Sequence, residues 1–347
     1  MAYTTVNKSS DYFNTKLYTG TGSSNAITGV GFQPDLLWIK SRSNTYSHSW
    51  TDAVRGKDNK IASNNSNAQY TDSGQLASFD SDGFTLNTDA GVNNNGSTFT
   101  SWNWKANGAG SSNTNGSITS TVSANTTSGF SIVKWTGTSA NATIGHGLGA
   151  VPKMIIIKSL ANATFWMTYH SSLGNNSEIY LNRADYGASA SSTAWQDTDP
   201  TSSVFYVGGG GGDGVNVSGD YVAYCFAEKK GYSKINSYVG NGGNNNEAPF
   251  IYTGFKPSFF LVKKSSASGE DWAIYDDKRN AFNKVDEALF PSATTVETSV
   301  GNGIDFLSNG IKINDDGGEL NTSGATYIYY AIGQSIVGTN NVPATAR

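Results

Sequence analysis

One stretch of ten residues, repeated three times, constrains the fold more than any other feature of the chain. It reads GFQPDLLWIK at 31–40, GAVPKMIIIK at 149–158 and GFKPSFFLVK at 254–263. In each copy a proline is followed six positions later by a lysine that closes an apolar run. Proline has no amide hydrogen and is found at the start of a strand rather than in its middle. Consecutive large apolar residues predict a strand that is covered on both faces.

The spacing of these stretches indicates whole domains. Pro34, Pro152 and Pro257 lie 118 and 105 residues apart, which is too long for the unit of a solenoid. Two further features accompany the stretch: each copy closes on a strand rich in aromatic residues, and copies one and three carry an Asp-Gly or Asn-Gly hairpin signal. We therefore predict three tandem copies of one small β-domain, with copy two the most divergent.

Strands separated by Gly, Asn and Ser turns predict antiparallel sheets that pack as sandwiches. The predicted fold is all-β, with three tandem antiparallel β-sandwich domains of the jelly-roll or lectin-like kind. Residues 280–290 are the best candidate for a short helix. The predicted divisions are an N-terminal arm (1–12), repeat 1 (13–107), a Gly/Ser/Asn/Thr linker (108–128), repeat 2 (129–230), repeat 3 (231–337) and a C-terminal tail (338–347). Within the linker, Ile118 and Val122 favour some pairing with a sheet.

Composition excludes several classes of function. Only 14% of residues are charged and the net charge is −4, with no basic cluster of the kind that nucleic-acid binding requires. A single cysteine, Cys225, leaves no disulfide framework. No window approaches the ~20 apolar residues of a membrane span, and the N-terminus has no signal-peptide core. We expect a chain that is made in a cytoplasm, neither binds nucleic acid nor inserts into a membrane, and needs no cofactor.

Two Asp-x-x-Arg motifs are the candidate polar sites. Asp52 and Arg55 in copy one match Asp276 and Arg279 in copy three. Such a carboxylate can act as a general acid or a ligand, or it can fix a loop through an ion pair. Copy two has His170 at the aspartate position, which favours the structural alternative. We predict Asp–Arg contacts in copies one and three.

Two other sets of side chains allow more than one interpretation. Trp102 and Trp104 alternate along the closing strand of copy one, so both rings lie on one face. They can stack on a sugar or pack against the opposite sheet, and packing is favoured. The lysines that end the repeated stretches are interpreted as caps that protect sheet edges from aberrant pairing: Lys40, Lys158 and Lys263.

Catalytic and metal signals are weak. The acidic turns at 80–83 and 315–319 lack a complete calcium-loop pattern, and the three histidines belong to different elements of the repeat. We predict no catalytic, cofactor-binding or metal-binding residues.

Copy one resembles a domain that recurs, often in tandem, in virion structural proteins of tailed phages of marine and freshwater bacteria. The resemblance covers residues 13–107 and is fainter beyond. It is carried by the Tyr-Thr-Gly of 18–20, the stretch 30–42, Asp52-x-x-Arg55-Gly56, the hairpin of 79–86 and the closing strand of 96–106. The resemblance implies a component of the particle with no known catalytic residues.

The expected function is that of a non-enzymatic virion protein on the particle surface, as head decoration or a fibre-type component. It is expected to form a homo-oligomer, with a trimer favoured, to contact other capsid or tail proteins, and to assemble in the host cytoplasm. The alternative is a receptor-binding tail protein that recognises host surface glycans. A glycan depolymerase is the third hypothesis, and it requires two carboxylates about 5 to 9.5 Å apart in a groove.

Overall fold

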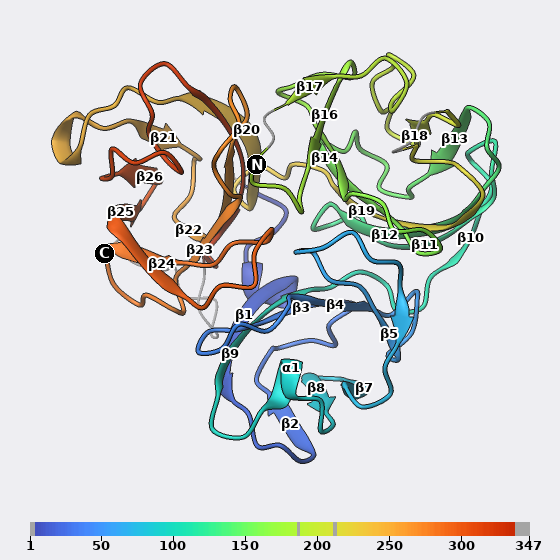
Figure 1. Ribbon diagram of the computed structural model, residues 1–347, viewed down its shortest axis with the longest axis horizontal. Coiled ribbons are helices and arrows are strands. Elements are labelled where there is room, and N and C mark those ends of the chain that lie inside the picture. Colours follow the sequence, from blue (N-terminus) through green and yellow to red (C-terminus); the bar gives the residue numbers. More distant parts are fainter. Residues whose placement is uncertain (1–3, 186–187, 211–213, 337–347) are drawn as a thin grey trace.

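The protein is nearly all β-structure, arranged as three lobes around a common centre (Figure 1). The computed structural model describes residues 4–185, 188–210 and 214–336. The predicted C-terminal tail, 338–347, lies outside these residues. The blue and cyan lobe is copy one, the green lobe is copy two and the orange lobe is copy three.

Copy one consists of two antiparallel sheets and a short pair of strands. The four-stranded sheet has the order β1 (Phe13–Thr19), β9 (Thr98–Trp104), β3 (Leu36–Ser41) and β4 (Ser49–Asp52). The three-stranded sheet has the order β2 (Asn25–Thr28), β8 (Gly83–Leu86) and β7 (Leu76–Asp80). The remaining elements are β5 (Asn59–Lys60), β6 (Tyr70–Thr71), α1 (Ala90–Asn93) and the 3₁₀ turn η1 (Ser9–Asp11).

Copy three repeats this plan with two four-stranded sheets. One has the order β20 (Ser233–Val239), β27 (Thr326–Gly333), β22 (Pro257–Lys264) and β23 (Ala273–Asp276). The other has the order β21 (Phe250–Tyr252), β26 (Gly310–Ile313), β25 (Thr298–Leu307) and β24 (Val285–Ala288), and the turn η2 (Asn245–Glu247) precedes β21.

Copy two has a longer sheet of eight strands. Its order is β10 (Ser111–Asn113), β11 (Ser120–Asn125), β12 (Phe130–Gly137), β19 (Gly219–Phe226), β14 (Met154–Ser159), β15 (Met167–His170), β16 (Ser177–Tyr180) and β17 (Ser189–Ala190). A second, two-stranded sheet pairs β13 (Ala142–Gly145) with β18 (Val204–Val207). The middle four strands, β12-β19-β14-β15, match the four-stranded sheets β1-β9-β3-β4 and β20-β27-β22-β23.

The repeated stretch occupies the third strand of each matching sheet. Its central residue always pairs with an aromatic residue of the closing strand: Trp38 with Trp102, Ile156 with Tyr224, and Leu261 with Tyr330. All residues of β3 and β14 are buried, so the expectation of strands covered on both faces is confirmed.

A single central core joins the three lobes. One face of each matching sheet contributes to one cluster of buried side chains, which includes Trp38, Trp102, Tyr224, Phe259 and Tyr330. The opposite face of each sheet packs on a smaller cluster confined to its own copy. Alternate residues of every inner strand therefore point to two different cores, and the copies are not independent of one another.

The two predicted hairpins form, but their glycines act differently from the prediction. The turns are Ser81–Asp82 and Ser308–Asn309, and each glycine is the first residue of the following strand. A Cβ on Gly83 would lie 1.9 Å from the carbonyl oxygen of Ile27, and one on Gly310 would lie 2.3 Å from that of Ile251. Glycine is required because the neighbouring strand approaches closely.

Residues 108–128 have the composition of a flexible linker, and the expectation that Ile118 and Val122 let part of them pair with a sheet is confirmed. Strands β10 and β11 extend the sheet of copy two, with Val122 opposite Val133 and Ile118 bridged to Ile144. The expectation of a helix at residues 280–290 is wrong. This segment contains strand β24 (Val285–Ala288), because a short apolar pattern fits both a helix and a strand, and here the strand pairs with β25.

Candidate functional site: the junctions between the copies

The two Asp-x-x-Arg motifs form buried ion pairs. Nε of Arg55 lies 2.5 Å from Oδ2 of Asp52, and Nε of Arg279 lies 2.6 Å from Oδ2 of Asp276. Both aspartate side chains are fully buried. In each motif the other carboxylate oxygen accepts the backbone N–H of the arginine at 2.9 Å. The motif therefore closes a turn on itself and holds a charge inside the protein.

Each carboxylate also accepts a hydrogen bond from a neighbouring copy. The hydroxyl of Tyr224, in copy two, donates to Oδ2 of Asp52 at 2.8 Å. Nε1 of Trp102, in copy one, donates to Oδ2 of Asp276 at 3.0 Å. Tyr224 and Trp102 hold equivalent positions in their closing strands, so the same contact joins copy two to copy one and copy one to copy three.

The remaining junction, between copies two and three, uses a histidine. His170 stands where copies one and three have aspartate, and its Nε2 lies 3.3 Å from the backbone carbonyl oxygen of Tyr329 in copy three. The neutral ring donates where the carboxylates accept. The three contacts therefore link the copies in a cycle. Two of them use a carboxylate as acceptor, and the third uses a histidine as donor.

A second set of equivalent contacts follows the same cycle. The residue eight or nine positions after the repeated lysine carries a ring N–H that reaches a backbone carbonyl of another copy. His48 contacts Phe290 at 2.9 Å, Trp166 contacts Ala62 at 3.1 Å, and Trp272 contacts Tyr180 at 2.9 Å. Buried polar groups need such partners, because an unpaired one costs about 1–3 kcal/mol.

The three repeated lysines do not protect sheet edges, and that interpretation is corrected here. Lys40, Lys158 and Lys263 are each fully buried, and burial lowers the pKa of each to about 8. Their ammonium groups donate to backbone carbonyls that follow the strand. Two also cross a junction, Lys158 to Ser66 of copy one and Lys263 to Ala184 of copy two, at 3.2 Å in both cases.

The two tryptophans for which sugar stacking was the alternative to packing are buried and unable to serve as a sugar platform. Trp102 and Trp104 are 0% and 2% exposed. Trp104 packs against Phe13 and Phe259, with ring centroids 4.8 and 5.8 Å away. Neither ring face is open to a ligand, because the third copy covers the surface that an isolated sandwich would expose.

The histidines share one tautomer. Nδ1 of His48 accepts from Nε1 of Trp38 at 2.8 Å, and Nδ1 of His170 accepts from the backbone N–H of Ser172 at 3.2 Å. Nε2 must then carry the proton that it donates across the junction. Protonation of Nδ1 would bring two N–H groups together, and burial already lowers the pKa of His170 to about 4.

We expect acid to weaken the junction at His170. The folded-state pKa of about 4 lies below the ordinary value of 6.5, so between these values the unfolded chain binds more protons. The contribution of His170 is fully present above pH 6.5 and is lost as the pH falls through 4. The difference of 2.5 pKa values corresponds to about 3 kcal/mol.

This expectation has two measurements. NMR should find the ring signals of His170 titrating near pH 4. Acidification from above pH 6.5 to below pH 4 lowers the free energy of unfolding. In the variant His170→Asn this decrease should be smaller by about 3 kcal/mol. Carboxyls such as Asp277, whose pKa is raised, stabilise the folded protein as the pH falls. Their contribution is the same in the variant and in the unmodified protein, so it cancels in the comparison. A His170 that titrates near 6.5 would contradict the account.

In the part of the chain that the structure describes, no group of three or more His, Cys, Asp or Glu side chains could hold a metal ion. None of the helices in that part is long and apolar enough to cross a membrane.

Sequence reasoning missed Tyr224 and Glu297, which complete the junctions. The carboxylate of Glu297 pairs with Arg42 of copy one at 2.6 Å and with Arg279 at 3.2 Å. The register of the closing strands is the signal that could have identified Tyr224.

Comparison with known proteins gives one match. No curated protein and no solved structure matches the chain. A family model described as a domain of unknown function, DUF7483, matches residues 8–335. That match spans all three copies and therefore treats them as one unit. The chain belongs to the DUF7483 family.

Proposed function

We propose that the chain is a non-enzymatic structural protein of a bacteriophage particle. One observation carries this proposal: the polar groups that recur between the copies are buried and make hydrogen bonds within and between the copies. Asp52, Arg55, Asp276 and Arg279 are buried and hydrogen-bonded, as are the three repeated lysines. These groups are unable to reach a substrate, while the variable loops stay at the surface.

The resemblance of copy one to tandem domains of phage virion proteins supports the same proposal. We propose that each copy is a β-sandwich of the jelly-roll or lectin-like class, because two sheets enclose a cluster in each lobe. A rigid, disulfide-free unit of this kind suits head decoration, which we favour over a fibre because the sequence has no heptad stalk. Assembly as a homotrimer bound to capsid or tail proteins belongs to the proposal.

Mass spectrometry of purified particles tests this function. We expect the chain in particles of the encoding phage after banding in a density gradient, and gold-labelled antibodies on their surface. Phage-infected lysate depleted of particles is the control. Absence of the chain from purified particles would contradict a virion role.

A second function, recognition of host surface glycans, is favoured by an aromatic ring other than the two considered from the sequence. Phe282 is 80% exposed and lines a polar cavity of copy three.

A further inference from the structure

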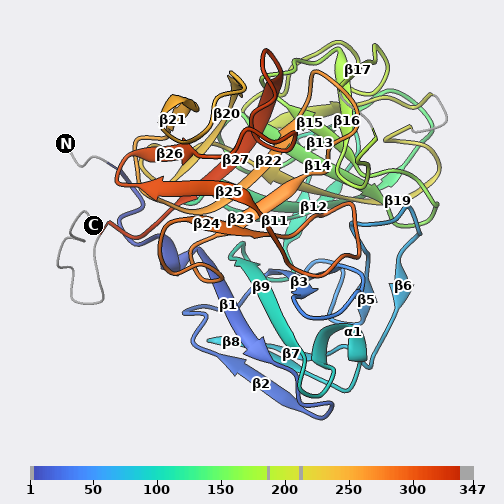
Figure 2. The ribbon, with the colours of Figure 1, turned by 60° about the vertical axis from the view of Figure 1, so that its left-hand side comes forward.

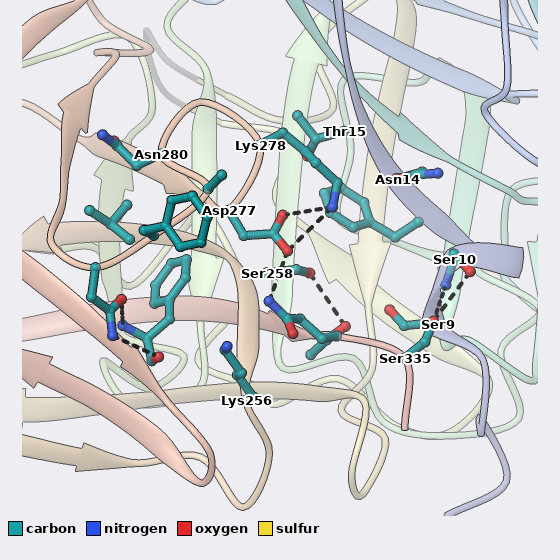
Figure 3. Close-up of a pocket in the computed structure, with 18 residues that line it drawn as sticks. Ser9, Ser10, Asn14, Thr15, Lys256, Ser258, Asp277, Lys278, Asn280 and Ser335 are labelled. Carbon is teal, nitrogen blue, oxygen red and sulfur yellow. Dashed lines mark hydrogen bonds and ion pairs between the residues drawn. The ribbon is translucent and has the colours of Figure 1, made fainter. Parts of the chain in front are cut away.

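A cavity of about 760 Å³ lies where the N-terminal segment meets copy three. Its wall comes from η1 and β1 on one side, and from β22, the 277–285 loop and the end of β27 on the other (Figure 3). Ligand sites typically measure about 300–1,000 Å³ and combine apolar walls with a few polar groups. This cavity has both kinds of lining, since Phe13, Phe282 and Phe306 stand among hydroxyl, amide and charged side chains.

Copy three has a short side chain at one position of the repeat that lines this cavity. The residue after the proline is Asp35 in copy one, and its carboxylate caps the backbone N–H of Ala106 at 2.7 Å. In copy two it is Lys153, which pairs with Glu228. Copy three has Ser258 there, facing Gln334 instead of Glu228. The groups that fill this place in the other copies are absent from copy three.

Charged groups of different sign meet inside the cavity. Oδ2 of Asp277 accepts from Nε2 of Gln334 at 2.9 Å, and Lys278 lies 3.4 Å from its carboxylate. Lys256 also lines the cavity (Figure 3). Among the described residues its ammonium group has no ion-pair partner. The equivalent positions of Asp277 are Ala53 and Ser171, and those of Lys256 are Gln33 and Val151, so this charge pattern is particular to copy three.

Two further observations indicate a hydroxylated ligand. Burial raises the pKa of Asp277 to about 6, so this carboxyl gains from each additional donor. Phe282 supplies an exposed ring, and an aromatic ring contributes large contact area with little loss of entropy. Hydroxyl partners beside an aromatic face fit a sugar.

We propose that this cavity binds a short saccharide that carries a carboxylate, with its ring on Phe282, its hydroxyls on Asp277, and its acid group on Lys256. The site deepens the second function proposed above and does not depend on where the chain is displayed.

Isothermal titration of the purified full-length chain tests the site, with digalacturonate as the acidic probe and galactobiose as its neutral counterpart. We expect digalacturonate to bind at least tenfold more tightly than galactobiose. Phe282→Ala should weaken binding at least tenfold, whereas Tyr252→Ala should leave it unchanged. Tyr252 is also an exposed aromatic, at 64%, but does not line the cavity.

A second variant fills the cavity with a side chain that copy two carries at the same position of the repeat. Ser258→Lys introduces the equivalent of Lys153, keeps the hydrogen bond from Gln334 to Asp277, and should abolish binding while the unfolding temperature is retained. Binding that survives this variant would overturn the site, and so would the failure of both probes to bind. Equal affinity for the two probes would overturn the assignment of Lys256. These results are independent of the particle analysis, since that experiment detects location and this one detects a ligand.

Discussion

Replacing Asp276 by alanine should lower the free energy of unfolding by about 3–5 kcal/mol. The substitution removes the carboxylate that lies 2.6 Å from the buried Nε of Arg279 and leaves this guanidinium with the more distant Glu297, at 3.2 Å. Arg279 is 0% exposed at its side chain, so water is unable to take the place of the carboxylate. Burial alone raises the pKa of Asp276, yet the charge and hydrogen bonds of Arg279 hold that pKa below its ordinary value. The folded protein therefore keeps this carboxyl ionised, and the substitution removes its negative charge.

Urea denaturation measures the effect. Asp58→Ala is the matched control, since Asp58 pairs with Lys57 at the surface and its loss should change stability by no more than about 0.5 kcal/mol. Trp102→Phe removes the donor from the neighbouring copy, so a double-mutant cycle with Asp276→Ala should give a coupling of about 0.5–3 kcal/mol. A loss below about 1 kcal/mol in Asp276→Ala would mean that the pair behaves as a surface salt bridge.

An isolated copy one, residues 13–107, should fail to fold. The central core buries one face of its four-stranded sheet, including Trp38, Trp50, Trp102 and Trp104. Four tryptophans bury about 800 Å² in total, which is worth about 20 kcal/mol. If contacts among the rings keep half of this area buried in the fragment, the fragment loses about 10 kcal/mol of stabilisation. A loss of that size matches the whole stability of a typical domain.

Circular dichroism and proton NMR of this fragment provide the measurement. We expect poorly dispersed amide signals or aggregation, because the exposed face is large and apolar. The control is the full-length chain under the same conditions. A fragment that folds cooperatively and stays monomeric would show that copy one has a sufficient core of its own.

The repeat allowed much of the fold to be predicted. Pro34, Pro152 and Pro257 mark the same strand in three sheets of the same order, because a proline at the start and an apolar run beyond it restrict a strand in the same way each time. The Asp-x-x-Arg motif is likewise local: three residues separate the partners, and the turn between them brings their side chains together.

The way the copies meet could not be predicted from the same pattern. A run of apolar residues such as that of β3 predicts that both faces of the strand are covered. It does not identify the elements that cover them. Lys40, Lys158 and Lys263 were therefore assigned to sheet edges, whereas all three are buried. Trp102 was expected to pack against the opposite sheet of its own copy, whereas it lies in the central core and contacts Asp276 of copy three. Contacts between residues more than 150 positions apart, such as Tyr224 with Asp52, depend on the cyclic arrangement. Figure 2 shows how closely the lobes pack.

Differential scanning calorimetry of the full-length chain is the most direct test of the claim that three copies share one core. If they do, the chain unfolds in one transition and the van't Hoff enthalpy equals the calorimetric enthalpy. Three separate sandwiches joined by linkers would instead give a van't Hoff enthalpy of about one third of the calorimetric value, or resolved transitions. The first result is the one this structure predicts, and the second would contradict it.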